Sequence, residues 1–425
     1  MGLVIVILQV WTWIVVAIML VYAIRHWIFT LNRLTGWQRP YYQDMLDSDL
    51  PPVSVIVPMR NEDTVAAAVL DALIASNYPK DLLEIIPVDD QSRDDTTTIA
   101  YEYSQRYAFI KPIYNLQGER GKSNALNRAM THASNEIVLV FDADYTPGKD
   151  LVRELVMAFI DPEVGAVMGR VVPRNSSTSF LTRLLALERS GGYQVDQQAR
   201  YNLDLFPQYG GTVGGFRRSV VIELGGFSLE TLAEDTDLSA RLFLHGWRIM
   251  YANRAECYEE VPDSWNGRFT QLRRWAHGHN RAFAVNIGPL LRSRKLSAVQ
   301  KLDAALLLFI YCVPPILLSG IAVNALLFYM GSIPFFPGIM FAFFVVSYNA
   351  MGNFAPVFEV GAAEVLDGGR ERLYLLPSLF YLFLFNSWAV TSGAIDAFGD
   401  YVKTRRAEWD VTRRANAKEK DAAAS

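Results

Sequence analysis

Two carboxylates one residue apart, Asp142 and Asp144, directly follow the apolar run of residues 137–141. Carboxylate oxygens at this spacing can supply part of the coordination shell of Mg²⁺ or Mn²⁺ and leave positions open for the phosphates of a nucleotide. Taken alone, such a pair more often caps a helix or solvates a turn. The other candidate residues of the chain favour the metal site.

A second acidic pair, Asp89 and Asp90, also ends an apolar run. These carboxylates could accept hydrogen bonds from the N–H and O–H donors of a base or ribose, although an ordinary turn with a helix cap explains them equally. Lys122 stands at the expected start of a helix, where backbone amides and an ammonium favour phosphate. The alternative for Lys122 is a solvated lysine.

Glu234 and Asp235 open another expected helix. They bring more acid to a helix start than capping requires, which indicates a catalytic base, although capping explains part of the pattern.

Gln271, Arg274 and Trp275 share one helical face by their i, i+3, i+4 spacing. A tryptophan face can stack on a sugar ring, and a guanidinium can offset phosphate charge. Aromatic and cationic anchors of a helix at a membrane interface are the alternative.

The elements that must position these residues follow an α/β pattern between residues 51 and 262, where short β-branched runs alternate with amphipathic helical stretches. Ligands in open α/β sheets lie beyond the carboxyl ends of the strands, so the acids are expected to converge there. The pattern predicts strands at 53–58, 85–88 and 137–141 and helices at 63–75, 94–107 and 121–132. The glycine-rich stretch 209–216 permits close backbone approach to donor or acceptor.

The chain of 425 residues is 51% hydrophobic, and its net charge of −4 argues against nucleic-acid binding. Residues 3–24 are almost uncharged and would span about 30 Å as a helix, enough to cross a bilayer. Without a charged n-region or a cleavage site, this stretch is expected to be a retained anchor. Arg25, His26, Arg33 and Arg39 follow it, which places the next domain in the cytosol. Cys257 and Cys312 are expected to be small core residues.

Basic and aromatic residues alternate over 265–291, which suits an amphipathic helix at a membrane surface, and 180–199 is a weaker candidate for the same role. Three apolar segments follow, at 304–330, 335–357 and 373–397, and Pro314 with Pro315 interrupts the first. Three crossings would put the basic tail outside, against the charge rule, so one segment is expected to be re-entrant or surface-lying unless a crossing is missed. The loop expected at 359–372 is the place to look.

Taken in order, these residues resemble the inverting, membrane-bound glycosyltransferases of family 2. That family includes cellulose, chitin, hyaluronan and poly-N-acetylglucosamine synthases, and it carries the pattern D, D, D, Q-x-x-R-W. The resemblance covers residues 53–275 and is specific as a set. It implies a GT-A fold, which is an α/β, Rossmann-like mixed sheet, in a cytosolic domain with flanking transmembrane helices.

The resemblance also implies roles for individual residues. Ala233 replaces the threonine of the family's T-E-D motif, and the other matches are intact. By this resemblance Asp89 and Asp90 contact the nucleotide, Lys122 and Asp142 bind the donor, and Asp144 with Asp142 ligates Mg²⁺ or Mn²⁺. The resemblance makes Asp235, beside Glu234, the catalytic base, and it assigns Gln271, Arg274 and Trp275 to the leaving group and the acceptor. It also places Thr412 and Arg413 in a cytosolic gating segment near the diphosphate.

The implied enzyme transfers a sugar, most simply from a UDP-sugar, to a growing β-linked polysaccharide in a processive way. The alternative is a single-transfer glycolipid synthase of the ceramide or diacylglycerol type. A third possibility is a transport or scaffold protein that only senses nucleotide, but it gives the acids no role. The expected partners are a nucleotide-sugar donor, a glycan or lipid acceptor, membrane lipid and accessory export subunits, in a multi-pass protein of the plasma membrane. The expected domains are an anchor and linker (1–50), a catalytic domain (51–262), an interfacial helix (263–300), a membrane region (301–400) and a basic tail (401–425).

Overall fold

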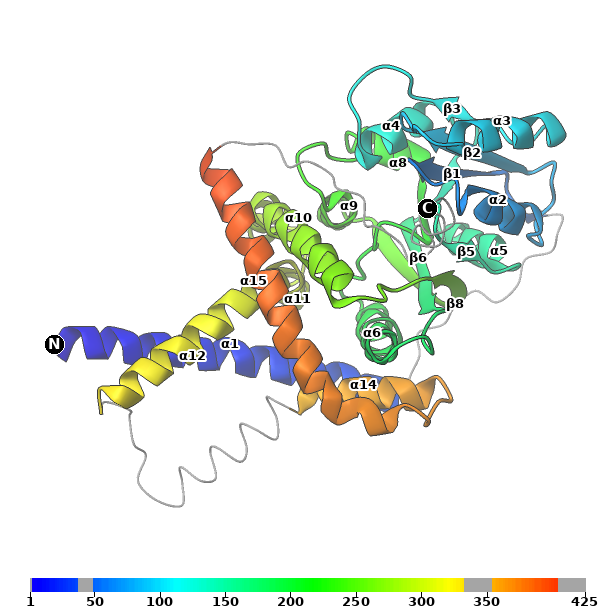
Figure 1. Ribbon diagram of the computed structural model, residues 1–425. Coiled ribbons are helices and arrows are strands. Elements are labelled where there is room, and N and C mark those ends of the chain that lie inside the picture. The colour runs from blue at the N-terminus through cyan, green and yellow to red at the C-terminus, as the bar shows by residue number, and fades with distance from the viewer. Residues whose placement is uncertain (1, 37–48, 332–353, 404–425) are drawn as a thin grey trace.

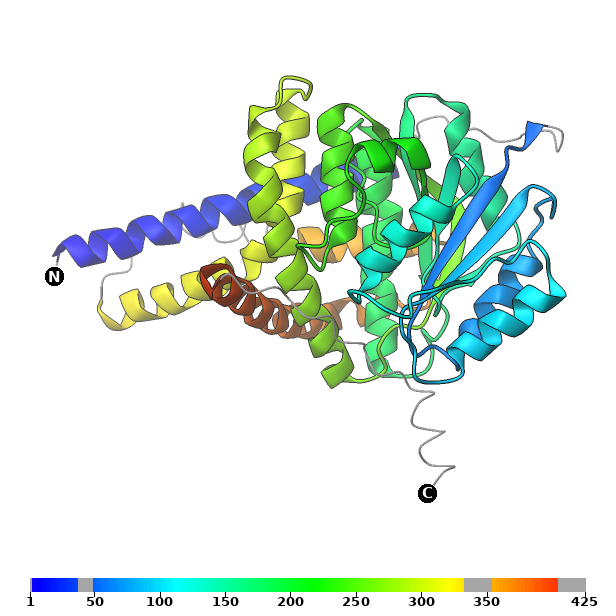
Figure 2. The ribbon, with the colours of Figure 1, turned by 90° about the horizontal axis from the view of Figure 1, so that it is seen from above.

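The computed structural model describes residues 2–36, 49–331 and 354–403. A mixed β-sheet with helices on both faces forms one side of the molecule, and α1 (Gly2–Leu34) and α12 (Val313–Tyr329) extend away from it (Figure 1). The view from above shows both helices leaving the α/β domain in the same direction (Figure 2). The predicted α/β class with flanking apolar helices is confirmed.

The strands of the described residues are β1 (Val53–Met59), β2 (Leu83–Asp89), β3 (Ile113–Tyr114), β4 (Ile137–Val140), β5 (Thr146–Pro147), β6 (Val164–Pro173), β7 (Gly214–Arg217) and β8 (Arg248–Glu259). They form one sheet in the order β3-β2-β1-β4-β7-β6-β8-β5. Strands β3, β2, β1 and β4 run parallel, whereas β7 is antiparallel to both β4 and β6. Strand β8 is parallel to β6 and antiparallel to β5, so the sheet is mixed, as expected.

The first strands end at one edge because they are parallel and in register. Val53 of β1 pairs with both Leu83 of β2 and Ile137 of β4. The polar residues that follow β1, β2 and β4 therefore lie beside one another, where ligands bind in open α/β sheets.

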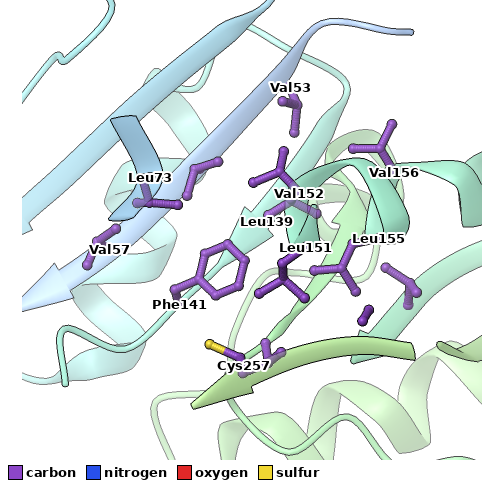
Figure 3. Close-up of a cluster of buried hydrophobic side chains, with 14 of the residues drawn as sticks. Val53, Val57, Leu73, Leu139, Phe141, Leu151, Val152, Leu155, Val156 and Cys257 are labelled. Carbon is purple, nitrogen blue, oxygen red and sulfur yellow. The ribbon is translucent and has the colours of Figure 1, made fainter. Parts of the chain in front are cut away.

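Side chains of β1 alternate between two cores, because successive residues of a strand point to opposite faces. Val53 and Val57 face a cluster that includes Phe141 and Leu155 (Figure 3). Ile56 faces the other cluster. The first cluster is covered by α2 (Ala66–Ile74), α3 (Thr96–Arg106) and α5 (Leu151–Val156), and the second by α4 (Lys122–His132), α8 (Arg218–Glu223) and α9 (Glu234–His245). The helices predicted from the sequence at 63–75, 94–107 and 121–132 are α2, α3 and α4.

Most side chains of residues 180–199 are at least partly buried by protein. Helix α6 (Phe180–Ser190) continues through a π-helix, η3 (Gly191–Gln197), into α7 (Gln198–Asn202). The buried leucines of α6 cluster with Leu375 and Leu379 of the C-terminal helices. Placement of 180–199 at a membrane surface stays a prediction, because the helices that cover its leucines belong to a stretch that is itself apolar enough to cross a membrane.

Helix α10 (Trp265–Arg292) is the predicted amphipathic helix. Its Leu272 and Ala276 pack against Ala389 and Val390 of α15 (Leu379–Lys403). In Figure 1 the two helices run side by side, with α10 nearer the sheet. Placement of α10 at a membrane surface stays a prediction.

The apolar segment expected at 304–330 is divided. Helix α11 (Ala298–Phe309) is followed by a short 3₁₀ turn (Ile310–Cys312) and then by α12, whose first turn holds Pro314 and Pro315. Proline is tolerated there because its missing N–H has no helical acceptor. Ala304 and Leu308 of α11 are buried in the second core with Leu290 of α10, so this part of the segment packs on the α/β domain.

Most of the stretch 359–372, expected as a loop, is helical. Helix α14 (Ala355–Leu366) covers its first half, and a 3₁₀ helix (Leu373–Ser378) precedes α15. The loop prediction is wrong for residues 359–366, because the charges of Glu359 and Glu364 do not mark solvent exposure, whereas residues 367–372 lie in neither a helix nor a strand. Both side chains are buried, and they pair with His26 and Arg372.

Three stretches of the described residues are long and apolar enough to cross a membrane: Gly2–Leu34, Ala298–Tyr329 and Leu373–Asp400. The segment expected at 335–357 lies almost wholly outside the described residues, and so does the basic tail. Cys257 is buried as expected, whereas Cys312 is partly exposed.

Arg25, His26 and Arg33 belong to the last turns of α1, whereas Arg39 lies outside the described residues. Arg25 pairs with Asp196 at 2.9 Å, and Arg33 Nε donates to the carbonyl of Gln194 at 2.7 Å. These charges therefore dock α1 on η3. Placement of the catalytic domain in the cytosol stays a prediction.

Candidate active site

A cavity of about 1060 Å³ lies at the carboxyl ends of β1, β2 and β4 and extends along α10. Residues from separate parts of the chain line it. Nine of the residues predicted from the sequence are among them: Asp90, Lys122, Asp142, Asp144, Glu234, Asp235, Gln271, Arg274 and Trp275.

Lys122 lies among carboxylates. Its Nζ is 2.6 Å from Oδ1 of Asp142 and 3.8 Å from Oε1 of Glu234, and it donates to the carbonyl oxygen of Gly211 at 2.9 Å. Burial would lower the pKa of Lys122, but Asp142 and Glu234 outweigh burial and hold that pKa above its ordinary value. Lys122 is therefore a charged group of the cavity and not a solvated surface lysine.

Asp235 lies in the first turn of α9, where its Oδ1 accepts a hydrogen bond from the backbone N–H of Thr236 at 2.6 Å. Gly211 approaches the other carboxylate oxygen. A β-carbon at Gly211 would stand 3.0 Å from Oδ2 of Asp235, and the φ of +81° also disfavours a side chain there. This glycine thus allows the backbone to come close to both Lys122 and Asp235.

The neighbouring acids Glu234 and Asp235 are harder to ionise than surface carboxyls. Desolvation by burial raises the pKa of Glu234, with Lys122 opposing the shift. Burial also raises the pKa of Asp235, where the N–H of Thr236 and the charge of Lys122 oppose it. A carboxylate with a raised pKa is a better proton acceptor, which is the property that a general base requires.

Asp89, the last residue of β2, and Asp90, which follows it, differ in their surroundings. Asp89 accepts hydrogen bonds from the N–H of Ser92 at 3.1 Å and the hydroxyl of Thr97 at 2.6 Å, as a turn residue does, and it does not line the cavity. Asp90 does line the cavity. Its carboxylate accepts from Asn115 Nδ2 at 2.6 Å and from the N–H of Gly121 at 2.7 Å, which ties it to the loop before α4.

The two acids after β4, Asp142 and Asp144, both reach the cavity. The backbone N–H of Asp142 donates to Oγ1 of Thr212 at 3.0 Å, which holds this turn against the glycine-rich stretch. Among the described residues no three His, Cys, Asp or Glu side chains are grouped so as to hold a metal ion. Mg²⁺ is commonly held by one or two carboxylates when phosphates and waters complete its shell. The pair Asp142 and Asp144 fits such a nucleotide-assisted site for Mg²⁺ or Mn²⁺.

Gln271, Arg274 and Trp275 line the cavity from one face of α10, as their spacing predicted. The half-buried ring of Trp275 has the guanidinium carbon of Arg189 at 5.2 Å from its centroid and that of Arg268 at 5.8 Å. These are cation–π distances, so the two arginines fix the orientation of the indole.

Helix α10 is held directly against the start of α9. A β-carbon at Gly278 would stand 2.8 Å from the backbone nitrogen of Ala233, which precedes Glu234. About two turns farther along α10, Asn286 Nδ2 donates to Oδ1 of Asp237 at 2.9 Å. This contact sets the position of Trp275 relative to Asp235.

Sequence reasoning missed His279, which lines the cavity four residues after Trp275. Its ring stacks on Tyr311 with centroids 4.4 Å apart, and its Nδ1 lies 2.9 Å from Oγ1 of Thr236. Burial lowers the pKa of His279 to about 4, so the imidazole is neutral at pH 7. The i, i+4 spacing from Trp275 could have identified it, whereas no local pattern pointed to Arg189.

Thr412 and Arg413, predicted to close over the nucleotide, lie outside the described residues. Their proximity to the cavity stays a prediction.

Comparison with known proteins gives a consistent result. Residues 51–278, more than half of the chain, match the family described as "Glycosyltransferase like family 2". The probable glycosyltransferase YdaM of Bacillus subtilis is 34% identical over 60% of this chain and 60% of its own. The β-monoglucosyldiacylglycerol synthase of Synechocystis is 32% identical over 54% of this chain and 48% of its own. The poly-β-1,6-N-acetyl-D-glucosamine synthase of Staphylococcus epidermidis is 27% identical over 61% of this chain and 63% of its own. The match therefore spans less than two thirds of the length of each relative.

A solved structure is similar over nearly the whole chain. The mannosyltransferase PcManGT of Pyrobaculum calidifontis, in complex with GDP-Man and Mn²⁺, superposes with a TM-score of 0.62 at 22% identity, covering 91% of this chain and 99% of its own. The likeness supports the same fold, including helices beyond the α/β domain.

Proposed function

The chain belongs to the glycosyltransferase-like family 2 and is a glycosyltransferase, and from this premise we propose that it moves a sugar from a nucleotide sugar, a UDP-sugar in the simplest case, to a hydroxyl of a membrane-held acceptor with inversion. One observation carries the proposal. Residues from the ends of β2 and β4, from α9 and from α10 line a single cavity, and they include Asp90, Asp142, Asp235 and Trp275. The idea of a protein that only senses nucleotide is dropped, because the family and the relatives are transferases.

Donor binding is assigned to the sheet edge. Asp90 accepts hydrogen bonds from the base or ribose, and Lys122 and Arg274 face the diphosphate with positive charge. When bound, Mg²⁺ or Mn²⁺ held by Asp142 and Asp144 supplies further positive charge to the leaving diphosphate. The Mn²⁺ in the complex of the Pyrobaculum mannosyltransferase supports a divalent ion here.

Transfer is assigned to Asp235. The acceptor hydroxyl attacks the anomeric carbon from the face opposite the diphosphate, its proton passes to Asp235, and the bond from the anomeric carbon to the phosphate oxygen breaks. One displacement inverts the centre, so an α-linked donor gives a β-linked product. Glu234 beside Asp235 keeps Lys122 close to the base. The indole ring of Trp275 stacks against the acceptor sugar or headgroup.

The acceptor is assigned to the end of the cavity that lies beside the apolar helices. The cavity reaches Leu307 and Ile310, which lie in a stretch apolar enough to cross a membrane. We place the enzyme as a multi-pass protein of the plasma membrane with its catalytic domain in the cytosol, and we assign Thr412 and Arg413 to a gating segment. Accessory export subunits belong to this proposal only if the product is a polymer.

Two acceptor classes are compatible with this placement. A growing β-linked polysaccharide, extended processively, is supported by the name of the Staphylococcus epidermidis relative, and a single transfer to a lipid by that of the Synechocystis relative. Labelled donor and the purified protein in membranes separate them: a chloroform-soluble product supports the lipid acceptor, and a long water-soluble or insoluble polymer supports processive synthesis.

The proposed activity is tested by a screen of UDP- and GDP-sugars for nucleotide release with and without Mg²⁺ or Mn²⁺. Release that depends on the metal with one donor is expected. No release with any donor, in the presence of membrane lipids and either metal, would contradict the proposal.

A further inference from the structure

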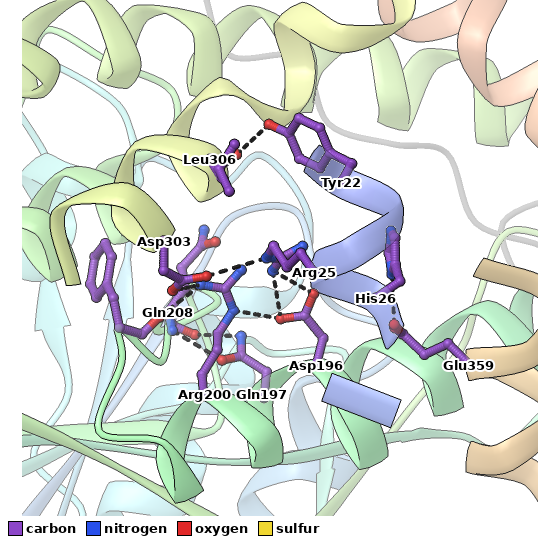
Figure 4. A network of polar contacts seen from close by, with 11 residues as sticks. Tyr22, Arg25, His26, Asp196, Gln197, Arg200, Gln208, Asp303, Leu306 and Glu359 are labelled. Carbon is purple, nitrogen blue, oxygen red and sulfur yellow. Dashed lines mark hydrogen bonds and ion pairs between the residues drawn. The ribbon is translucent and has the colours of Figure 1, made fainter. Parts of the chain in front are cut away.

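The end of the cavity beside α1 carries polar groups that the proposed reaction does not use. Arg25 of α1 and Asp196 of η3 both line the cavity there, next to Leu307 and Ile310. Figure 4 shows Arg25 and Asp196 facing each other, with Arg200 and Asp303 completing the group. Arg25 comes from the N-terminal helix, about half the chain away from Asp235.

The four side chains form a closed ion-pair network. Arg25 pairs with Asp196 at 2.9 Å and with Asp303 at 3.2 Å. Arg200 pairs with each of the same two aspartates at 2.5 Å. Two arginines and two aspartates carry no net charge together.

Arg25, a residue that lines the cavity, keeps one N–H group without a partner in the part of the chain that the structure describes. Arg25 is only 5% exposed, yet its Nη1 has no hydrogen-bond partner among the described residues. A buried guanidinium N–H without a partner is costly, so this position favours a ligand oxygen. The side chain of Asp196 is 24% exposed and can accept a hydrogen bond from a ligand hydroxyl.

A continuous polar wall joins this end of the cavity to the proposed base. Gln197, next to Asp196, accepts from the N–H of Gln208 and donates to its carbonyl, both at 3.0 Å. Gln208 Nε2 in turn donates to Oγ1 of Thr236, whose backbone N–H holds Asp235. Gln197, Gln208 and Asp235 line the same cavity as Arg25, so a molecule that touches Arg25 can extend through the cavity towards Asp235.

We propose that Arg25 and Asp196 form a subsite for the uncharged, hydroxyl-bearing headgroup of a lipid acceptor, an inference that rests on the proposed transferase function. Arg25 Nη1 donates to a headgroup oxygen, and Asp196 accepts from a headgroup hydroxyl. The acyl chains leave past Leu307 and Ile310. A phosphate headgroup is disfavoured because Asp196 faces it and the network has no excess positive charge.

The test uses the full chain in phosphatidylcholine nanodiscs with the donor found in the nucleotide-release screen. Three probes separate headgroup from chain: 1,2-dioctanoylglycerol, dioctanoyl phosphatidic acid with the same chains and a phosphate, and glycerol without chains. We expect dioctanoylglycerol to accelerate nucleotide release and to be glycosylated, and the other two probes to act far more weakly.

Two lysine variants of α1 test the residue. Arg25→Lys keeps the charge but removes the free Nη1, so the KM for dioctanoylglycerol should rise about tenfold while the KM for the donor stays near that of the natural protein. Arg33→Lys is the matched control, because Arg33 is buried on the same helix and binds the same π-helix but does not line the cavity. A rise in acceptor KM of the same size in both variants, or no rise in Arg25→Lys, would overturn the subsite.

Asp196→Asn tests whether the charge of this carboxylate selects an uncharged headgroup over a phosphate, a preference that a purely structural role of Asp196 would not change. Removing this carboxylate leaves excess positive charge, so the preference for dioctanoylglycerol over phosphatidic acid should fall or reverse. An unchanged preference counts against the proposal. Donor hydrolysis that persists while dioctanoylglycerol has no effect also overturns it, whereas loss of all donor turnover in the natural protein contradicts the transferase function itself.

Discussion

The ammonium of Lys122 lies 2.6 Å from Oδ1 of Asp142, so the first residue of α4 is paired with the aspartate that follows β4. The same ammonium is 3.8 Å from Glu234, the neighbour of the proposed base. One lysine thus connects the proposed metal site with the helix that carries the proton acceptor. Any change in its charge should affect both.

Lys122→Met should separate metal binding from transfer. The ammonium competes with a divalent cation for Asp142, so its removal should tighten Mn²⁺ binding in the absence of donor by roughly tenfold, the scale of one partly screened charge contact. Transfer should nevertheless fall, because the diphosphate loses a cation. Titration calorimetry with Mn²⁺ and the transfer rate check the two effects, and weaker Mn²⁺ binding in the variant would contradict this role.

Asp235→Asn should reduce transfer by about 10²–10⁴-fold, the usual contribution of a general base. Asparagine keeps the shape of the side chain, so binding of the nucleoside diphosphate should change little. Rapid-quench transfer assays and nucleotide binding by calorimetry measure the two quantities. The exposed Glu230→Gln, in the loop before α9, is the control, and near-normal transfer by Asp235→Asn would exclude this residue as base.

The pH profile should report the raised pKa of Asp235. The base must be ionised to accept a proton, so kcat/KM should fall as the pH falls through that pKa. Because burial raises the pKa, the acidic limb should lie above the ordinary value of about 4 for an aspartate. A rate that stays flat down to about pH 4, the ordinary pKa of an aspartate, would show that no carboxyl with a raised pKa limits the reaction.

Gly278→Ala should lower kcat more than it lowers stability. The added methyl group would meet the backbone of Ala233 at 2.8 Å and push α10 from the start of α9. A displacement of about 1 Å between Trp275 and Asp235 is enough for a loss of about 10²-fold. The control is Gly288→Ala in the same helix, where the nearest atom belongs to the flexible side chain of Arg292. Equal losses in both variants would point to general damage to α10.

Glu84→Gln should reduce stability at neutral pH but not in acid. Glu84 accepts hydrogen bonds from Ser54 at 2.5 Å, from the N–H of Ser134 at 2.9 Å and from Lys111 at 2.8 Å. Burial would raise its pKa, but these donors outweigh burial and lower that pKa to about 2. A depressed pKa stabilises the fold above about pH 4 and loses that effect as the pH falls towards 2.

The variant should therefore lose roughly 1–3 kcal/mol at pH 7, the range for hydrogen bonds to a charged group. The difference in unfolding midpoint should shrink as the pH falls below 4 or so. Thermal unfolding followed by tryptophan fluorescence measures it. A difference that does not depend on pH would assign the effect to shape and not to charge.

Local pattern alone was sufficient for much of the fold and of the candidate site. The strand before Asp142, the helix that starts at Lys122 and the shared face of Gln271, Arg274 and Trp275 were all predicted. Each depends on residues a few positions apart, because a strand alternates every second residue and a helix repeats every 3.6. The convergence of the acids also followed, since parallel strands bring their carboxyl ends to one edge.

Local pattern was misleading where a charge is buried. Glu359 was placed in a loop, but in α14 it is buried and pairs with His26 of α1 at 2.6 Å. The leucines of α6 pack against Leu375 and Leu379, which belong to a stretch apolar enough to cross a membrane. The sequence does not say which apolar face meets lipid and which meets protein, since the chemistry of the two environments is alike for a leucine side chain.

The amino-acid sequence by itself determined the α/β class, the acidic residues at the strand ends and the helical face of Trp275. Only the tertiary structure brought Arg25 beside Asp196, placed Arg189 over Trp275 and separated Asp90, which lines the cavity, from Asp89, which ends β2 outside it. The reason is distance along the chain. Helix and strand periods are set by neighbouring residues, whereas a contact between residues far apart in sequence depends on how all the intervening elements pack.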